Sequence, residues 1–151
     1  MSAETINNAY FMAMESMATL NRNAALLMRK YASHGATDVT GFGLLGHAEN
    51  LAAAQHDKVD LILHSLPVFR GMTEHVSGMP DFKVAQGYSA ETSGGILTML
   101  QPEKAKDFIA ELEQEHGQKS WIVGQVVKGD RKAKINDDVS ILSVNESFLL
   151  K

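Results

Sequence analysis

The sequence predicts an α+β fold in which helices cover a mixed β-sheet. Helical periodicity dominates the first thirty residues, isolated strand-like runs follow, and a group of short strands separated by turn residues comes last. Helices and strands that are grouped in this way, instead of strictly alternating, are typical of α+β proteins. The 151 residues contain no repeat and no linker-like stretch, so a single domain over residues 1–151 is predicted.

The first helical region extends to about residue 31. Apolar or small residues recur in steps of four and three from Ile6 to Tyr31, which is the spacing of one helix face. Thr19 and Asn21 both suit an N-cap, so two helices that meet near Leu20 fit the pattern as well as one long helix. The methionines in this stripe predict core packing.

Helices and loops alternate with strands in the middle of the chain. Gly35 is expected to end the first helical region in a left-handed conformation, and a loop then runs to Leu44. From Leu44 a helix with several alanines is predicted to pack closely on a sheet. A short helix is expected around residues 72–76, and a further helix from Pro102 to Gly117.

Strand composition marks two central segments and the tail. Residues 59–65 form the first predicted strand, which Pro67 is expected to end, and residues 96–100 form the second. In the tail, three strands separated by turn residues predict an antiparallel meander. These strands cover 121–127, 132–135 and 139–144.

Composition excludes several classes of partner and site. The formal net charge is -4, and the fourteen Lys and Arg residues are spread along the chain, so neither nucleic acid nor a membrane surface is a predicted partner. No apolar run approaches the ~20 residues that span a bilayer, and no signal peptide precedes the first helix, which predicts a cytoplasmic location. The absence of cysteine excludes disulfides, thiolate metal sites and a Cys nucleophile.

The segment 36-ATDVTGFGLLGH-47 contains the spacing G-x-G-x-x-G at Gly41, Gly43 and Gly46. A dinucleotide-binding fingerprint needs a strand directly before the glycines and an acidic residue after the next strand. Here a helix is expected before the loop, and the acidic residues precede the next strand. The sequence context therefore argues against a dinucleotide site.

Asp38 is the carboxylate of this glycine-rich segment, and two interpretations of it stay open. A carboxylate beside bare backbone is a common way to hold Mg²⁺ against phosphate, because this ion prefers oxygen ligands. Alternatively, Asp38 caps the turn by accepting local backbone N–H groups.

A second glycine-rich segment is 91-ETSGG-95. It predicts either an anion-binding nest of backbone N–H groups or a tight turn with φ angles that only glycine tolerates, and the turn is favoured. The six histidines show no metal-ligand spacing, and His47 is predicted to be structural. No G-x-S-x-G elbow supports a hydrolase triad. Glu111, Glu113 and Glu115 are interpreted as a solvated helix flank.

Four segments together resemble the C-terminal domain of the selenophosphate synthetase (selenide, water dikinase) family, within the aminoimidazole ribonucleotide synthetase superfamily. The resemblance runs from about Asn7 to Val144, and the string T-D-V-T-G-F-G separates this family from thiamine monophosphate kinase and the purine synthetases. The segments are 20-LNRNAALLM-28, 36-ATDVTGFGLLGH-47, 91-ETSGGIL-97 and 121-WIVGQVVKGDRKAKI-135.

The resemblance implies a reaction in which ATP, selenide and water give selenophosphate, AMP and phosphate. It implies a requirement for Mg²⁺, with K⁺ as a further expected ion. In that family the one aspartate of this loop helps to hold magnesium on the ATP phosphates, so the implied metal ligand here is Asp38. Three residues are implied to shape the backbone beside the nucleotide: Thr40, Gly41 and Gly43.

A superfamily turn that is implied to contact substrate anions also matches this sequence. Its residues here are Thr92, Ser93, Gly94 and Gly95. The family commonly has a proline shortly before this turn, whereas this sequence has Ala90.

The resemblance further implies an N-terminal domain with the catalytic Cys or selenocysteine, a Lys and the remaining magnesium-binding aspartates. We therefore expect this chain to be a fragment that has no catalytic residue of its own, is inactive alone, and exposes an apolar surface that the other domain would cover. The full-length protein is expected to be a homodimer. Two alternatives stay open: another ATP-dependent enzyme of the superfamily, or a non-catalytic interaction domain that stands alone.

Overall fold

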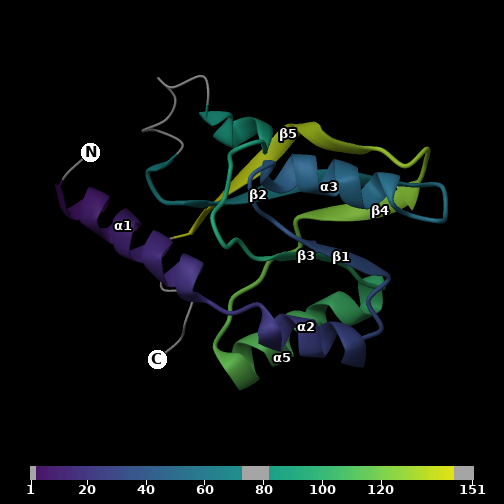
Figure 1. The fold of residues 1–151 in the computed structure, drawn as a ribbon, viewed down its shortest axis with the longest axis horizontal. Coiled ribbons are helices and arrows are strands. Elements are labelled where there is room, and N and C mark those ends of the chain that lie inside the picture. Colours follow the sequence, from purple (N-terminus) through teal and green to yellow (C-terminus); the bar gives the residue numbers. More distant parts are fainter. Residues whose placement is uncertain (1–2, 73–81, 145–151) are drawn as a thin grey trace.

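The computed structural model describes residues 3–72 and 82–144, and Figure 1 shows their arrangement. Helices and a mixed sheet are both present, which confirms the predicted α+β class. The expected helix at 72–76 lies almost entirely outside the described residues. In chain order the elements are α1 (Ala3–Ala18), α2 (Arg22–Lys30), β1 (Gly35–Asp38), α3 (Gly43–Ala53), β2 (Val59–Phe69), the 3₁₀ helix η2 (Val84–Gln86), β3 (Ile96–Met99), α5 (Pro102–His116), β4 (Gly124–Lys128) and β5 (Ala133–Val144).

The strands form two sheets. β1 and β3 make an antiparallel pair, whereas β4, β2 and β5 make a three-stranded mixed sheet in that order. In Figure 1 the β1–β3 pair lies between α3 on one side and the neighbouring helices α2 and α5 on the other. Strand β1, which ends at Asp38, therefore lies between two layers, one formed by α3 and the other by α2 and α5 (Figure 1).

Two apolar clusters hold these layers together. The larger joins α3 to β2 and β3 and includes Ala48 and Ala52, neither of which exposes any surface. These small side chains let α3 approach the sheet closely, as predicted. The smaller cluster joins Leu27 of α2 to Phe108 and Leu112 of α5.

The contact between α2 and α5 also contains a polar cluster around Glu111. Lys30 Nζ and Tyr31 Oη donate to its carboxylate at 2.6 and 2.7 Å. The hydrogen bond from Lys30, followed by that from Tyr31, lowers the pKa of Glu111. The prediction of a purely solvated flank was therefore wrong for Glu111, because α2 packs against this face of α5.

The first helical region is two helices, and the second ends at an unexpected residue. Ala32, not Gly35, has the left-handed φ of 54°. Its N–H donates to Arg29 O at 3.3 Å, and Ser33 N–H donates to Met28 O at 2.9 Å. These two bonds form a Schellman C-cap, in which a residue without a Cβ is preferred at the position of Ala32.

Ala32→Gly is therefore expected to raise the free energy of unfolding by about 0.5–1 kcal/mol. Relief of the strain of a left-handed alanine, about 1–2 kcal/mol, exceeds the extra chain entropy of glycine in the unfolded state. Denaturant unfolding measures the change. As a control, Ala25→Gly inside α2 is expected to lower stability by about 1 kcal/mol, and a loss of stability in both variants would contradict the C-cap assignment.

Two strand boundaries differ from the predictions. Gly35–Asp38 is a strand and not a loop, because it pairs with β3 over Gly35↔Met99 to Asp38↔Ile96. β2 continues through Pro67 to Phe69. Beyond Leu63, β2 pairs only with β5. A proline is tolerated there because the other edge of the strand needs no donor.

The predicted meander was wrong. β4 and β5 do not pair with each other, since β2 lies between them, antiparallel to β4 and parallel to β5. The predicted strands 132–135 and 139–144 are parts of one strand, β5, which begins at Ala133. Its register against β2 shifts between Leu63↔Ile135 and Ser65↔Ser140, so the expected turn at 136–138 is an irregularity within the strand.

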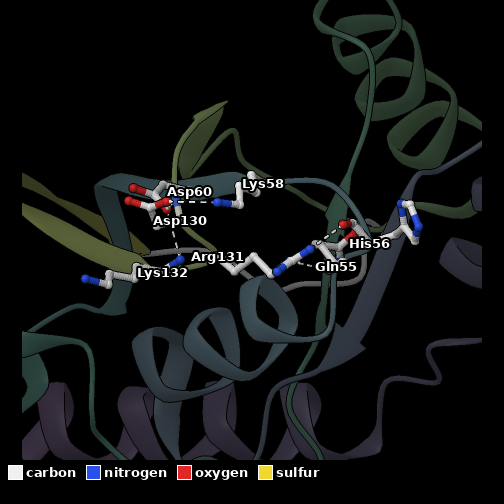
Figure 2. A network of polar contacts seen from close by, with 7 residues as sticks. All are labelled: Gln55, His56, Lys58, Asp60, Asp130, Arg131 and Lys132. Carbon is white, nitrogen blue, oxygen red and sulfur yellow. Dashed lines mark hydrogen bonds and ion pairs between the residues drawn. The ribbon is translucent and has the colours of Figure 1, made fainter.

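The short connection from β4 to β5 crosses the start of β2, as Figure 2 shows. Asp60 Oδ1 accepts hydrogen bonds from the backbone N–H groups of Asp130 at 2.7 Å and Lys132 at 2.9 Å. Arg131 has a left-handed φ of 64° and donates to the carbonyls of Gln55 and His56. These bonds to the residues before β2 hold the connection across that strand.

The Asp60 contacts predict a pH dependence of stability. The hydrogen bonds from Lys132 and then from Asp130 lower the pKa of Asp60 below its usual 3.8. A lowered folded-state pKa gives stability that is present above the unfolded pKa and is lost as the pH falls through the folded pKa. Wild-type protein is therefore expected to melt at a higher temperature than Asp60→Asn at neutral pH. The difference between the two melting temperatures should close as the pH falls from about 4 through the folded-state pKa of Asp60.

Asp137→Asn is the control for this experiment, because Asp137 is an exposed residue of β5. This variant should melt like the wild type across the same pH range. A gap between wild type and Asp60→Asn that persists unchanged at acid pH would show that the carboxylate charge is not what holds the connection.

Candidate functional site

The structure brings the two glycine-rich segments together at the end of β1. Asp38 lies opposite Ile96 in the β1–β3 ladder. Beyond the ladder, Val39 N–H donates to Gly95 O at 2.9 Å, and Glu91 N–H donates to Thr40 O at 2.9 Å. Segments more than fifty residues apart in sequence therefore form one surface, with Asp38 and the 92–95 turn side by side.

Asp38 is the last residue of β1, and it is exposed. Within the described part of the chain its carboxylate takes part in no hydrogen bond or ion pair. The capping interpretation therefore has no hydrogen bond to support it among these residues. Across 3–72 and 82–144, no group of three or more His, Cys, Asp or Glu could hold a metal ion. Asp38 would need ligands from a phosphate, from water or from another polypeptide segment.

Thr40 and His47 fix the backbone just after Asp38. Thr40 N–H donates to His47 Nε2 at 2.9 Å, which places the ring proton on Nδ1. His47 is 8% exposed, and its ring also lies against Phe42. The structural role predicted for His47 is confirmed. Both backbone groups of Thr40 are hydrogen bonded, and its hydroxyl lies 3.2 Å from His47 Nε2, so the backbone after Asp38 is held in place.

The three glycines of the loop have different roles. Gly43 has a φ of 69°, and a Cβ there would lie 2.6–2.7 Å from backbone atoms of residues 87–89. A Cβ on Gly46 would lie 2.8 Å from Phe42 Cβ, whereas one on Gly41 would meet nothing within 4 Å. Gly43 and Gly46 therefore serve packing, and Gly41 alone leaves open space beside the loop.

A strand does precede these glycines, contrary to the sequence-based argument against a dinucleotide site. That strand is β1, and its partner β3 is antiparallel, while the strand that follows α3 lies in the other sheet. A dinucleotide-binding unit needs two parallel neighbouring strands joined by the helix. The arrangement of the strands therefore argues against a dinucleotide site, whereas the sequence-based argument, that a helix precedes the loop, was wrong.

The 92–95 turn presents several free backbone donors. None of the N–H groups of Thr92, Ser93, Gly94 and Gly95 donates to another described residue. Ser93 has the left-handed φ of 49°, whereas neither glycine of the turn has a positive φ. The prediction that Gly94 and Gly95 adopt φ angles that only glycine tolerates was therefore wrong. Gly94 is needed because a Cβ there would collide with Val39 O. Successive unpaired N–H groups with one left-handed residue are typical of an anion-binding nest.

Residues 7–135 match the family model described as "AIR synthase related protein, C-terminal domain". The chain belongs to this family. As an AIR synthase related C-terminal domain, it carries both glycine-rich segments inside the matched region.

Three curated relatives bear related names. The chain is 44% identical to "Selenide, water dikinase 2" of Homo sapiens over 146 residues, 95% of this chain and 33% of the human protein. It is 44% identical to "Selenide, water dikinase" of Trypanosoma brucei brucei over 149 residues (95% and 38%), and 38% identical to the Dictyostelium discoideum protein of the same name over 151 residues (98% and 41%). The resemblance seen in the sequence is confirmed. The chain spans about a third of the length of the first of these relatives.

Glu91 is a residue of this AIR synthase related domain that the sequence did not single out. Although the residue as a whole is exposed, its carboxylate lies against Gly94, and burial raises the pKa of this carboxyl above its usual 4.5. Its only signal in the sequence is an acidic residue directly before the turn. Burial disfavours the charged form of this carboxyl, which lies beside the free N–H groups of the turn.

The domain also exposes apolar surface near the site. α1 contacts β2 but buries only Met12, and Tyr10 and Phe11 are 63% and 62% exposed. A cavity of about 1200 Å³ lies between α1, β2, β3 and α5, and its wall includes Glu91 and the 92–95 turn. No helix in the described part of the chain is long and apolar enough to cross a membrane.

Proposed function

We propose that this domain supplies one magnesium ligand, the Asp38 carboxylate, to the ATP site of an enzyme that makes selenophosphate from selenide, ATP and water. The products would be AMP and phosphate, as the sequence resemblance implies. The proposal is supported by the names of the relatives, which are selenide, water dikinases. The single observation that carries it is the exposed Asp38 carboxylate, free of hydrogen bonds to described residues, beside the free N–H groups of residues 92–95.

The donor set fits a magnesium-bound phosphate. Mg²⁺ prefers oxygen ligands and is usually held by one or two carboxylates together with phosphate oxygens. Asp38 offers such an oxygen, and the 92–95 turn offers N–H donors that suit an anion. When bound, the metal would neutralise charge on the phosphates, which is the main requirement of phosphoryl transfer. Thr40 and Gly41 would then border the nucleotide, while Gly43 shapes the backbone from inside the fold.

One carboxylate is too few for the site, so the proposal includes a further domain of a longer protein. That domain would bring the other metal-binding aspartates and the catalytic Cys or selenocysteine and Lys, and this chain alone would be inactive. The exposed side chains of α1 and the apolar cavity beside the site are surface that such a domain could cover. A homodimer in the cytoplasm and a requirement for K⁺ belong to the same proposal.

The test is replacement of Asp38 by Asn in the longer protein, with magnesium-dependent ATP consumption as the measurement. ATP consumption at the wild-type rate would exclude the metal role.

A further inference from the structure

Asn21 is the N-cap residue of α2, yet its side chain makes no capping hydrogen bond. Instead, Asn21 Nδ2 donates to Gly94 O at 3.0 Å, across 73 positions of sequence. An Asn that caps its own helix contributes about 1 kcal/mol. In this fold the amide is directed at the 92–95 turn, so the segment 20-LNRNAALLM-28 is tied to the candidate site.

The bond from Asn21 fixes how the Gly94–Gly95 peptide faces. The described residues contain no cis peptide bond, and in a trans peptide the C=O and the N–H point in opposite directions. The elbow between α1 and α2 consists of residues 19–21. Because Asn21 holds Gly94 O, Gly95 N–H must point away from this elbow. On the other side of Gly95, the carbonyl accepts Val39 N–H at 2.9 Å, so the next peptide is fixed as well.

Gly95 N–H is consequently presented as a free donor. It has no acceptor among the described residues, Gly95 is exposed, and a Cβ there would meet nothing within 4 Å. The elbow that carries Asn21 is itself anchored, because Gln118 Nε2 donates to Leu20 O at 3.0 Å. Asn21 is thus a fixed support for the turn.

We propose that Asn21 is a positioning residue for an anion site, in which it holds the Gly94 carbonyl so that Gly95 N–H points at an oxygen of a phosphate group. This inference rests on the proposed function for the identity of the anion, a nucleotide phosphate. The contact itself requires only a tetrahedral oxyanion. Asn21 need not touch the substrate, since it acts through the peptide that it orients.

The experiment is a titration of this chain with sulfate, without magnesium, followed by the NMR shift of the Gly95 amide. In the wild type, the chemical shift of the Gly95 amide should change with sulfate concentration and reach a plateau. Asn21→Asp keeps N-capping ability but removes the donor to Gly94 O, and it should weaken sulfate binding about fivefold or more, which is the effect of losing one hydrogen bond. Asn21→Ser, whose hydroxyl is too short to reach Gly94 O, should do the same without a charge.

Asn23→Asp is the matched control. It adds the same charge to the first turn of the same helix, but no hydrogen bond of Asn23 to another described residue is lost. Its sulfate affinity should equal that of the wild type, and its melting temperature should be equal or slightly higher, because a negative charge near a helix N-terminus is stabilising. Absence of any shift at Gly95 in the wild type, or unchanged affinity in both Asn21 variants, would overturn the proposal.

The result separates this inference from the proposed function. Asp38→Asn should bind sulfate at least as tightly as the wild type, because no metal is present in the titration and the change removes a negative charge beside the turn. If Asp38→Asn also consumes ATP normally in the longer protein, the metal role fails while the role of Asn21 stands. If sulfate binding ignores Asn21 but ATP consumption depends on Asp38, the reverse holds.

Discussion

Asp38→Asn is expected to lower magnesium-dependent ATP consumption by the longer protein by about 100-fold or more. Asparagine keeps the size of the side chain and one oxygen, but it removes the negative charge that a hard divalent ion requires. Changes to residues that merely support metal ligands already cost about 10–100-fold. Loss of a direct ligand to a metal that neutralises phosphate charge should cost at least as much. Steady-state rates at varied magnesium and ATP concentrations measure the effect.

The melting temperature of the protein should be unaffected by Asp38→Asn. The Asp38 carboxylate makes no hydrogen bond or ion pair within the described part of the chain, so the melting temperature of Asp38→Asn should match that of the wild type. Asp57→Asn, at an exposed site before β2, is the control for loss of a surface charge and should keep full activity. A slow variant with a lowered melting temperature would point to a folding defect and would not support a metal role.

The parts of the fold that the sequence predicted depend on local patterns. The helix faces, the proline at the start of α5 and Gly117 at its end, where φ is 64°, follow from spacing and caps within a few residues. The alanines of α3 likewise predicted close packing. The resemblance to known proteins rested on short strings of residues, and these could be recognised without any structure.

The errors concern bonds between distant residues. The short turn between β4 and β5 favoured direct pairing, but the Asp60 carboxylate and the Arg131 guanidinium hold this connection across β2. The segment Gly35–Asp38 has little strand propensity and becomes a strand through its pairing with β3. Asn21 satisfied the pattern of a helix cap, and only the fold shows that it binds Gly94. In each case a tertiary contact overrides the local preference.

Gly43→Ala is expected to lower the free energy of unfolding by about 3 kcal/mol or more. Gly43 has a φ of 69°, and a left-handed alanine costs about 1–2 kcal/mol. The added Cβ would also lie 2.6 Å from Tyr88 C and 2.7 Å from Gly87 O. These are backbone atoms, and Gly87 O accepts the N–H of Leu45 at 2.8 Å, so the neighbouring segment cannot move without losing that bond. Denaturant unfolding measures the loss.

Gly41→Ala provides the matched control two residues earlier. A Cβ on Gly41 meets nothing within 4 Å, and Gly41 has no positive φ. Its stability should stay within about 0.5 kcal/mol of the wild type. The proposed function places Gly41 beside the nucleotide, so the added methyl group should instead weaken nucleotide binding in the longer protein. Equal stability losses at the two positions would mean that the loop adapts to a side chain at either glycine, and the close approach of Gly43 to residues 87–89 would then not be what fixes the backbone after Asp38.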